Sequence, residues 1–212
     1  MIGIFGGTFD PVHYGHIKPV LDVKQSLGLE ELRFIPCSVP AHRAAPVATV
    51  AQRLAMLHAA IDEYENCIID ERELNRQGVS YMVDTLQSLQ YDLSGKVFCL
   101  IIGMDAFFCL NQWYQWQRIF SLANCVVTYR PGFELNLAQL PADLCSEVKQ
   151  RQIDSIKAFA GQQQGAIFFM PVTQIDISAT DIRQRIKHKQ SIEEFVPPAV
   201  NNVIQQQKIY AG

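Results

Sequence analysis

The stretch Gly6-Gly7-Thr8-Phe9-Asp10-Pro11-Val12-His13-Tyr14-Gly15-His16 decides the architecture that we expect for this chain. It follows a short apolar segment, residues 1–5, which predicts a β-strand. It leads into residues 15–27, which predict a helix that ends at Gly28. The stretch is therefore the turn between a first strand and a first helix.

The same alternation continues along the chain. Thr49 is a plausible N-cap for the second helix, and its apolar face is expected to carry Val50, Leu54, Leu57 and Ile61. Alternating strands and helices predict an α/β, Rossmann-like, doubly wound and mostly parallel sheet with helices on both faces and a small C-terminal helical extension. The further predicted strands are 32–36, 67–69, 97–102, 125–129 and 166–170, and the further helices are 49–64, 80–93, 135–160 with a break near Pro141, 181–188 and 198–206.

Composition limits the class of protein. The chain has 212 residues, of which 49% are hydrophobic, so residues 1–212 are expected to form a single domain on which the helical part from about 178 to 212 packs. The net charge of −3 gives no sign of a nucleic-acid partner. Neither a secretory signal nor a membrane span is evident, and the six cysteines show no metal or redox spacing. We therefore expect a cytoplasmic protein with reduced thiols.

The turn after the first strand combines features that suit phosphates. Gly6 and Gly7 let backbone N–H groups approach an anion closely, and a helix beginning near Gly15 directs its positive end to the same place. His13 and His16 add ring donors. Taken singly, a glycine pair is usually a turn and a histidine is usually structural, so the signal is the combination. Asp10 either contacts a ligand or, as we favour, fixes the turn before Pro11.

A second helix start lies near the end of the chain. Ser178 and Asp181 have the spacing of a capping box before residues 181–188, so a plain helix cap is the simpler interpretation. A helix N-terminus with Ser178, Thr180 and Arg183 in its first turns would also bind an anion. Both interpretations stay open at this point.

A third group follows the predicted strand 97–102. Gly103 and Asp105 suit a ribose, whose hydroxyl groups a carboxylate accepts. Trp113 and Trp116 either stack on a flat ring or pack in the core, and we favour packing for Trp116.

In combination these segments resemble a known signature. The first stretch is similar to that of the nucleotidyltransferase superfamily, in which a G-G-x-F/T segment precedes an H-x-G-H box. Residues 177–183 are similar to its I-S-S-T-x-I-R segment, with Ala179 in place of one serine. The resemblance narrows to the nicotinate-nucleotide adenylyltransferase family, whose ordered motifs match residues 6–16, 36–42, 53–56, 70–76 with 80–82, 103–105, 113–114, 130–132 and 177–183.

The resemblance implies roles for particular residues. His13 and His16 would stabilise the transition state. The ATP and its phosphates would be bound by Gly6, Gly7, Thr8, Phe9, Ser178, Arg183, Gly103, Asp105, His42 and Arg43. The nicotinate mononucleotide would be bound by Trp113, Tyr114, Ser80, Tyr81, Met82 and Arg130. From the residues alone, His42 and Arg43 could equally belong to a solvated basic loop, and we expect residues 39–48 to be a mobile loop over the site.

The activity implied is transfer of an adenylyl group from ATP to nicotinate mononucleotide, which yields deamido-NAD and pyrophosphate in NAD biosynthesis. Mg²⁺ would enter with ATP, and no protein metal site is expected. Partners are thus two nucleotides, without nucleic acid or membrane; a homo-oligomer is left open. Met82 replaces the threonine of the family's S-Y-T segment, so an enzyme acting on the amide mononucleotide, or on both, is the alternative. Ala41 replaces a proline of the family's P-P-H segment, which should loosen that loop.

Other classes fit less well. A dinucleotide-dependent oxidoreductase would need G-x-G-x-x-G after the first strand and an acidic residue at the end of the second, where this chain has Pro36 and Cys37. Pantetheine-phosphate and cytidylyl relatives share the outer motifs but not residues 113–114 and 130–132. An ATP-binding sensor without catalysis would not need both histidines and Arg183. We interpret residues 71–76 as a solvated charged loop, and His58 and His188 as structural.

Overall fold

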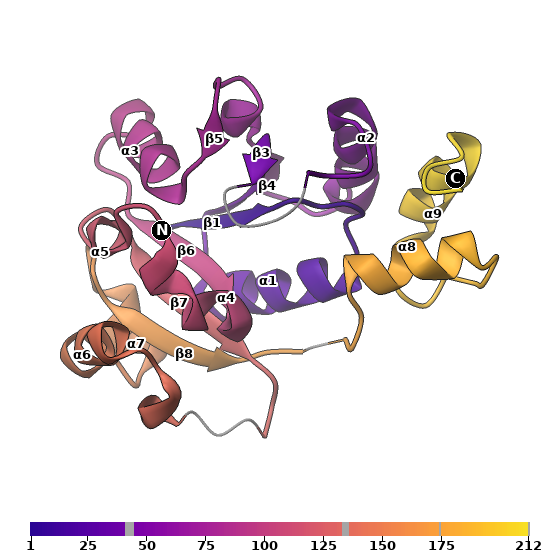
Figure 1. The fold of residues 1–212 in the computed structure, drawn as a ribbon. Coiled ribbons are helices and arrows are strands. Elements are labelled where there is room, and N and C mark those ends of the chain that lie inside the picture. The colour runs from indigo at the N-terminus through magenta and orange to yellow at the C-terminus, as the bar shows by residue number, and fades with distance from the viewer. Residues whose placement is uncertain (41–44, 133–135, 174, 212) are drawn as a thin grey trace.

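The central sheet has six strands, all parallel, in the order β4-β2-β1-β6-β7-β8 (Figure 1). The computed structural model describes residues 1–40, 45–132, 136–173 and 175–211. The strands are β1 (Ile2–Gly7), β2 (Glu31–Pro36), β4 (Cys67–Ile69), β6 (Phe98–Gly103), β7 (Asn124–Tyr129) and β8 (Ile167–Pro171). The chain order reverses between β1 and β6, so the carboxyl ends of these neighbours form the crevice where such sheets bind ligands.

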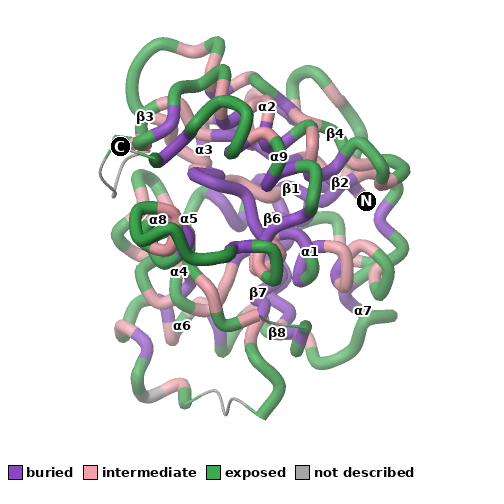
Figure 2. Tube along the Cα trace, turned by 90° about the vertical axis from the view of Figure 1, so that its right-hand side faces the viewer, coloured by how far each residue is buried: buried purple, intermediate pink, exposed green. Residues whose placement is uncertain are grey.

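Both faces of the sheet are covered, because alternate strand residues enter different cores. In β6, Cys99 and Ile101 join one cluster, whereas Leu100 and Ile102 join the other. Strands buried on both sides read as continuous apolar runs, which is the pattern seen in β6 and β7. Figure 2 shows this buried centre with exposed segments around it. The predicted α/β architecture with helices on both faces is confirmed.

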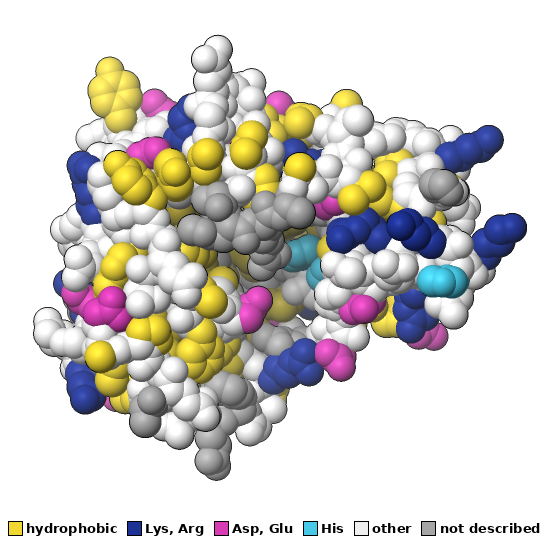
Figure 3. Space-filling model, viewed as in Figure 1, with side chains coloured by type: hydrophobic (Ala, Val, Ile, Leu, Met, Phe, Trp, Pro, Cys, Tyr) yellow, Lys and Arg dark blue, Asp and Glu magenta, His cyan; other side chains and the backbone are white. Residues whose placement is uncertain are grey.

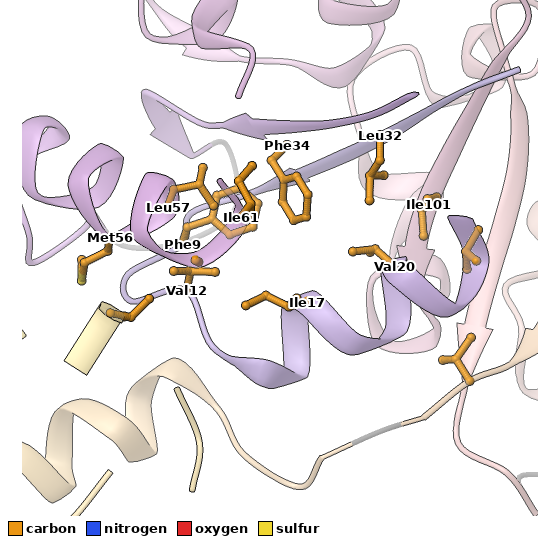
Figure 4. Close-up of a cluster of buried hydrophobic side chains, with 14 of the residues drawn as sticks. Phe9, Val12, Ile17, Val20, Leu32, Phe34, Met56, Leu57, Ile61 and Ile101 are labelled. Carbon is orange, nitrogen blue, oxygen red and sulfur yellow. The ribbon is translucent and has the colours of Figure 1, made fainter. Parts of the chain in front are cut away.

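One core joins the sheet to helices from both ends of the chain. Figure 4 shows Phe9, Ile17, Phe34, Met56 and Leu57 pointing toward one another within it. Its helices are α1 (Tyr14–Leu27), α2 (Val50–Ile61), α7 (Ile156–Ala160), α8 (Ala179–Lys187) and α9 (Pro198–Gln206). The other core uses α3 (Met82–Asp92), α4 (Met104–Phe108), α5 (Trp116–Ile119) and α6 (Ala142–Arg151), with short 3₁₀ turns at Leu110–Gln112 and Leu137–Gln139. A further 3₁₀ turn lies at Glu71–Glu73.

The short strands at Val39–Pro40 and Val79–Ser80 were not predicted, and neither were the short helices α4 and α5. The short strands β3 (Val39–Pro40) and β5 (Val79–Ser80) pair in parallel and make a separate two-stranded sheet. The Ser38 N–H donates to Ser80 Oγ (3.1 Å) beside it. Two-residue strands carry too little periodicity to be detected in a sequence.

The apolar face predicted for α2 was partly wrong. Thr49 caps the helix with a capping box, and Leu57 and Ile61 are buried, but Val50 is 42% exposed and Arg53 is only 1% exposed. Arg53 takes a place on the buried face, where its guanidinium donates to the Thr8 carbonyl (2.8 Å) and so gains a partner for a buried charge. The helix predicted over 135–160 is divided into three pieces, with breaks at Pro141 and at residues 152–155.

Candidate active site

The two histidines of the first stretch lie face to face at the beginning of α1. Their ring centroids are 3.7 Å apart with an angle of 29° between the planes. His13 is the N-cap of α1, and its carbonyl accepts from the N–H groups of His16 and Ile17. Both rings therefore lie at the positive end of a 14-residue helix that follows the central strand β1.

Burial keeps the His13 ring neutral. Its side chain is 5% exposed, and desolvation lowers its pKa from 6.5 to about 4. Within the part of the chain that the structure describes, its Nδ1 atom has no hydrogen-bond partner. A neutral imidazole has one N–H to donate, so His13 fits a ligand's anionic oxygen without carrying a charge itself.

Gly15 leaves the space that the His13 ring occupies. A Cβ atom at this position would lie 2.9 Å from His13 Nδ1 and 3.0 Å from Cε1. The glycine between the two histidines is therefore needed for the ring's position.

The end of β1 meets two other segments. A Cβ on Gly6 would lie 2.7 Å from the Met82 Cε methyl, so Met82 covers this part of the turn. A Cβ on Gly7 would lie 2.9 Å from the Phe9 ring. These glycines let the residues expected for the two substrates come together.

Phe9 cannot contact ATP through its side chain, contrary to the simplest form of the expectation. Its ring is 1% exposed and packs on Phe5, Phe34 and His16, with centroids 5.4 to 6.1 Å apart. An aromatic ring gains more from this burial than from facing a charged phosphate. Only the backbone of Phe9, at φ 51°, remains for a ligand.

Thr8 is held in place by hydrogen bonds from Arg53 and Cys37. Its carbonyl accepts from Arg53, and its hydroxyl oxygen accepts from the Cys37 thiol (3.7 Å). Burial raises the pKa of that thiol, so Cys37 stays protonated.

The predicted capping box at the start of α8 is confirmed, and the first turns of this helix also contact the segment that precedes His13. Ser178 Oγ accepts from the Asp181 N–H and donates to its carboxylate (2.6 Å). Arg183 donates to the Asp10 carbonyl (2.6 Å) and to Thr180 Oγ1 (3.1 Å). Ser178 is thus occupied as a cap, whereas Arg183 lies against the turn that precedes His13.

The interpretation that the Asp10 side chain fixes its own turn before Pro11 is wrong, because its carboxylate binds residues from other segments. It is 4% exposed and accepts from the N–H groups of Val47 (2.8 Å) and Ala48 (3.0 Å) and from the Tyr210 hydroxyl (2.7 Å). The expected mobile loop is therefore fastened at residues 47–48. His42 and Arg43, predicted to reach phosphates, lie outside the described residues.

Gly103 and Asp105 occupy the end of β6 and the start of α4. A Cβ on Gly103 would lie 2.7 Å from Asp105 Oδ1, so the carboxylate rests against the glycine. Because β6 pairs with β1, this carboxylate is at the point where the strand order reverses.

The residues expected around the pyridine ring come from two segments that meet. The rings of Tyr81 and Tyr114 are 4.7 Å apart, and Tyr114 is 49% exposed. Trp113 is half-buried, and Trp116 packs on Phe120 as favoured. Arg130 forms an ion pair with Asp176 (2.8 Å), which links it to the segment before Ser178.

The charged run 71–76 is not a solvated loop. Glu73 is 4% exposed and accepts from the Thr85 hydroxyl (2.6 Å), and Arg72 binds Asp70, which is 8% exposed. Burial raises the pKa of Glu73, whereas hydrogen bonds from Arg72 and Arg33 lower that of Asp70 despite its desolvation. The sequence does not show which distant residues will bind these charges, so the prediction of a solvated loop at residues 71–76 was wrong.

Figure 3 shows histidine surface in a hollow near the middle of one face, with Lys and Arg side chains beside it over α8.

Among the described residues, no group of three or more His, Cys, Asp and Glu side chains could hold a metal ion. No helix in the described ranges is long and apolar enough to cross a membrane.

Known proteins carry the same pattern over the whole chain. The cytidylyltransferase-like family model matches residues 4–185. A probable nicotinate-nucleotide adenylyltransferase of Methylococcus capsulatus is 44% identical over 212 residues and covers 100% of both chains. That of Halorhodospira halophila is 42% identical over 199 residues, which is 94% of this chain and 90% of its own.

The fold has solved counterparts. The nicotinic acid mononucleotide adenylyltransferase of Plasmodium falciparum, complexed with NaAD, has a TM-score of 0.73 at 16% identity, covering 99% of this chain and 97% of its own. A putative nicotinate-nucleotide adenylyltransferase of Vibrio parahaemolyticus has a TM-score of 0.66 at 15% identity, covering 99% and 94%. From its motifs, its fold and these relatives, the chain belongs to the cytidylyltransferase-like family and, within it, to the nicotinate-nucleotide adenylyltransferases.

Proposed function

We propose that this chain joins ATP and nicotinate mononucleotide to form deamido-NAD and pyrophosphate. The observation that carries the proposal is the stacked pair His13 and His16 at the N-terminus of α1, beside the glycine turn of β1. Full-length relatives named for this activity support it.

The reaction needs positioned donors rather than a nucleophile of the protein. A 5′-phosphate oxygen of the mononucleotide attacks the α-phosphorus of ATP, a P–O bond forms, and the bond to the bridging oxygen of pyrophosphate breaks. Charge builds on the α-phosphate oxygens and on the leaving group. We assign His13 and His16 to these oxygens, where preorganised donors lower the barrier without reorganising.

Arg183 is assigned to the leaving pyrophosphate. Two of its N–H groups are used by Asp10 and Thr180, and the remaining ones have no partner among the described residues. Gly6, Gly7 and the backbone of Thr8 and Phe9 would approach the triphosphate, and Asp105 would accept from the ribose hydroxyls. The Ser178 hydroxyl donates its only hydrogen to the Asp181 carboxylate, and its remaining lone pair cannot bind a phosphate oxygen, so we assign Ser178 to the helix cap rather than to a phosphate.

Mg²⁺ fits this site as part of the ATP complex, where it would neutralise triphosphate charge while keeping most of its waters. Asp70 and Glu73 are already bound to protein donors, and no carboxylate cage exists among the described residues. The cation would therefore be held by phosphate oxygens.

The mononucleotide is assigned to the surface formed by residues 80–82 and 113–114. Trp113 and the Tyr81–Tyr114 pair offer aromatic faces for the pyridine ring. Arg130 is a cation for the nicotinate carboxylate, although Asp176 competes for it. The same proposal treats residues 1–212 as one domain, supported by the packing of α8 and α9 into the core with α1 and α2, and as a cytoplasmic enzyme, which suits its free cysteines.

The test is pyrophosphate release with ATP and Mg²⁺, comparing nicotinate mononucleotide with its amide at equal concentrations. Preference for the acid supports the proposal. Equal use of both would assign the chain to the dual-specificity alternative, and ATP binding without release would indicate a sensor. His16→Ala should lower turnover about 100- to 1,000-fold, and unchanged turnover would remove the role given to this residue.

A further inference from the structure

The last residues of the chain reach the candidate ATP site. Tyr210 lies 7% exposed in the same core as α2 and α9, and its hydroxyl donates to Asp10 Oδ1 at 2.7 Å across 200 residues of sequence. Asp10 belongs to the stretch that carries His13. Tyr210 lies 27 residues beyond the last of the matched motifs, which ends at Arg183.

Asp10 connects three segments around the site. Its carboxylate accepts from the backbone of Val47 and Ala48, which begin the approach to α2, and its carbonyl accepts from Arg183 of α8. The carboxylate and the Arg183 guanidinium are 3.7 Å apart, which is beyond hydrogen-bond distance. Arg183 thus forms an ion pair with the Asp10 carboxylate but makes no hydrogen bond to it.

We infer that Tyr210 is a positioning residue for the triphosphate site, acting through Asp10 on Arg183 and on residues 47–48. The inference rests on the proposed function only in placing ATP beside Arg183.

The buried Asp10 carboxylate is satisfied by three donors. A buried carboxylate needs several donors, and the Tyr210 hydroxyl with two backbone N–H groups supplies them. Removing the hydroxyl would leave Oδ1 with the Ala48 N–H alone, and the Arg183 guanidinium, 3.7 Å from Oδ2, is the charged donor beside the carboxylate. The guanidinium would then close the 3.7 Å gap and give up N–H groups otherwise available to phosphate.

Two further contacts agree with this role. The Tyr210 hydroxyl also lies 4.0 Å from Met56 Sδ, with the Arg53 and Arg183 charges nearby. Burial and the Asp10 carboxylate raise the pKa of Tyr210, which keeps the phenol protonated as a donor.

The test is Tyr210→Phe, which removes only the hydroxyl. Loss of a hydrogen bond to a charged group predicts a KM for ATP raised about five- to tenfold, with the KM for nicotinate mononucleotide unchanged. Calorimetric titration with ATP should show the same weakening, independently of turnover. Tyr91→Phe is the surface control, because Tyr91 is 88% exposed.

Two more variants separate positioning from loss of stability. Ile209→Val removes packing next to Tyr210 without touching Asp10, and it should lower the melting temperature while leaving ATP binding unchanged. In an Arg183→Lys background, Tyr210→Phe should have less than half of its effect on ATP binding, since the two act through one path.

The inference is overturned if Tyr210→Phe lowers stability but leaves ATP binding unchanged, or weakens both substrates equally. It is also overturned if its effect is undiminished in the Arg183→Lys background. Failure of the wild-type chain to bind ATP at all would instead refute the proposed function.

Discussion

Replacing Gly15 with alanine should separate activity from stability in this protein. The new Cβ would lie 2.9 Å and 3.0 Å from two atoms of the His13 ring, so the ring must move, while the nearest backbone atom, the Ile175 carbonyl, is at an ordinary 3.6 Å. Displacing a reacting group by about 1 Å can cost about 100-fold in rate. Alanine is also a better helix former than glycine, by up to about 1 kcal/mol.

We therefore expect Gly15→Ala to lower kcat about 100-fold while its free energy of unfolding stays within about 1 kcal/mol of wild type. Pyrophosphate release under saturating substrates measures the first quantity, and urea unfolding measures the second.

Gly161→Ala is a matched control, because its Cβ would meet only backbone oxygens at 3.6 and 3.9 Å. It should keep full activity. If Gly15→Ala kept kcat within about threefold of wild type, a barrier change under about 1 kcal/mol, the role given to the His13 ring position would be wrong.

Three further predictions use other parts of the structure. Because the pKa of His13 falls from 6.5 to about 4 on folding, the unfolded chain takes up a proton that the folded chain refuses as pH drops below 6.5. Stability should fall by about 3 kcal/mol between pH 7 and pH 4 from this group, and His13→Gln should remove that part of the slope in urea titrations at several pH values. Thr85→Val deprives the buried Glu73 carboxylate of its 2.6 Å hydrogen bond, so unfolding free energy should drop by about 2 kcal/mol; a change under about 0.5 kcal/mol would show that another donor replaces it. Met82→Thr should raise the ratio of kcat/KM for acid over amide mononucleotide about tenfold by adding a hydroxyl, and an unchanged ratio would mean that position 82 does not read the carboxylate.

Local patterns predicted the elements because short-range physics determines them. The buried strand β6 and the capping boxes of α2 and α8 depend on neighbours only a few residues away. Long-range polar contacts were not predictable in the same way. The burial of Arg53 is one example, because its guanidinium binds the Thr8 carbonyl 45 residues earlier in the chain.

The sequence by itself determined the parallel α/β class, the family, and the two histidines separated by a glycine. These follow from hydrophobic periodicity and from motifs whose order along the chain can be recognised without the structure. Only the tertiary structure decided that Phe9 faces the core, that Glu73 is buried, and that Tyr210 meets Asp10. The physical reason is that burial and hydrogen-bond partners are properties of the packed chain: a carboxylate finds its donors among residues brought close by folding, wherever they lie in the sequence.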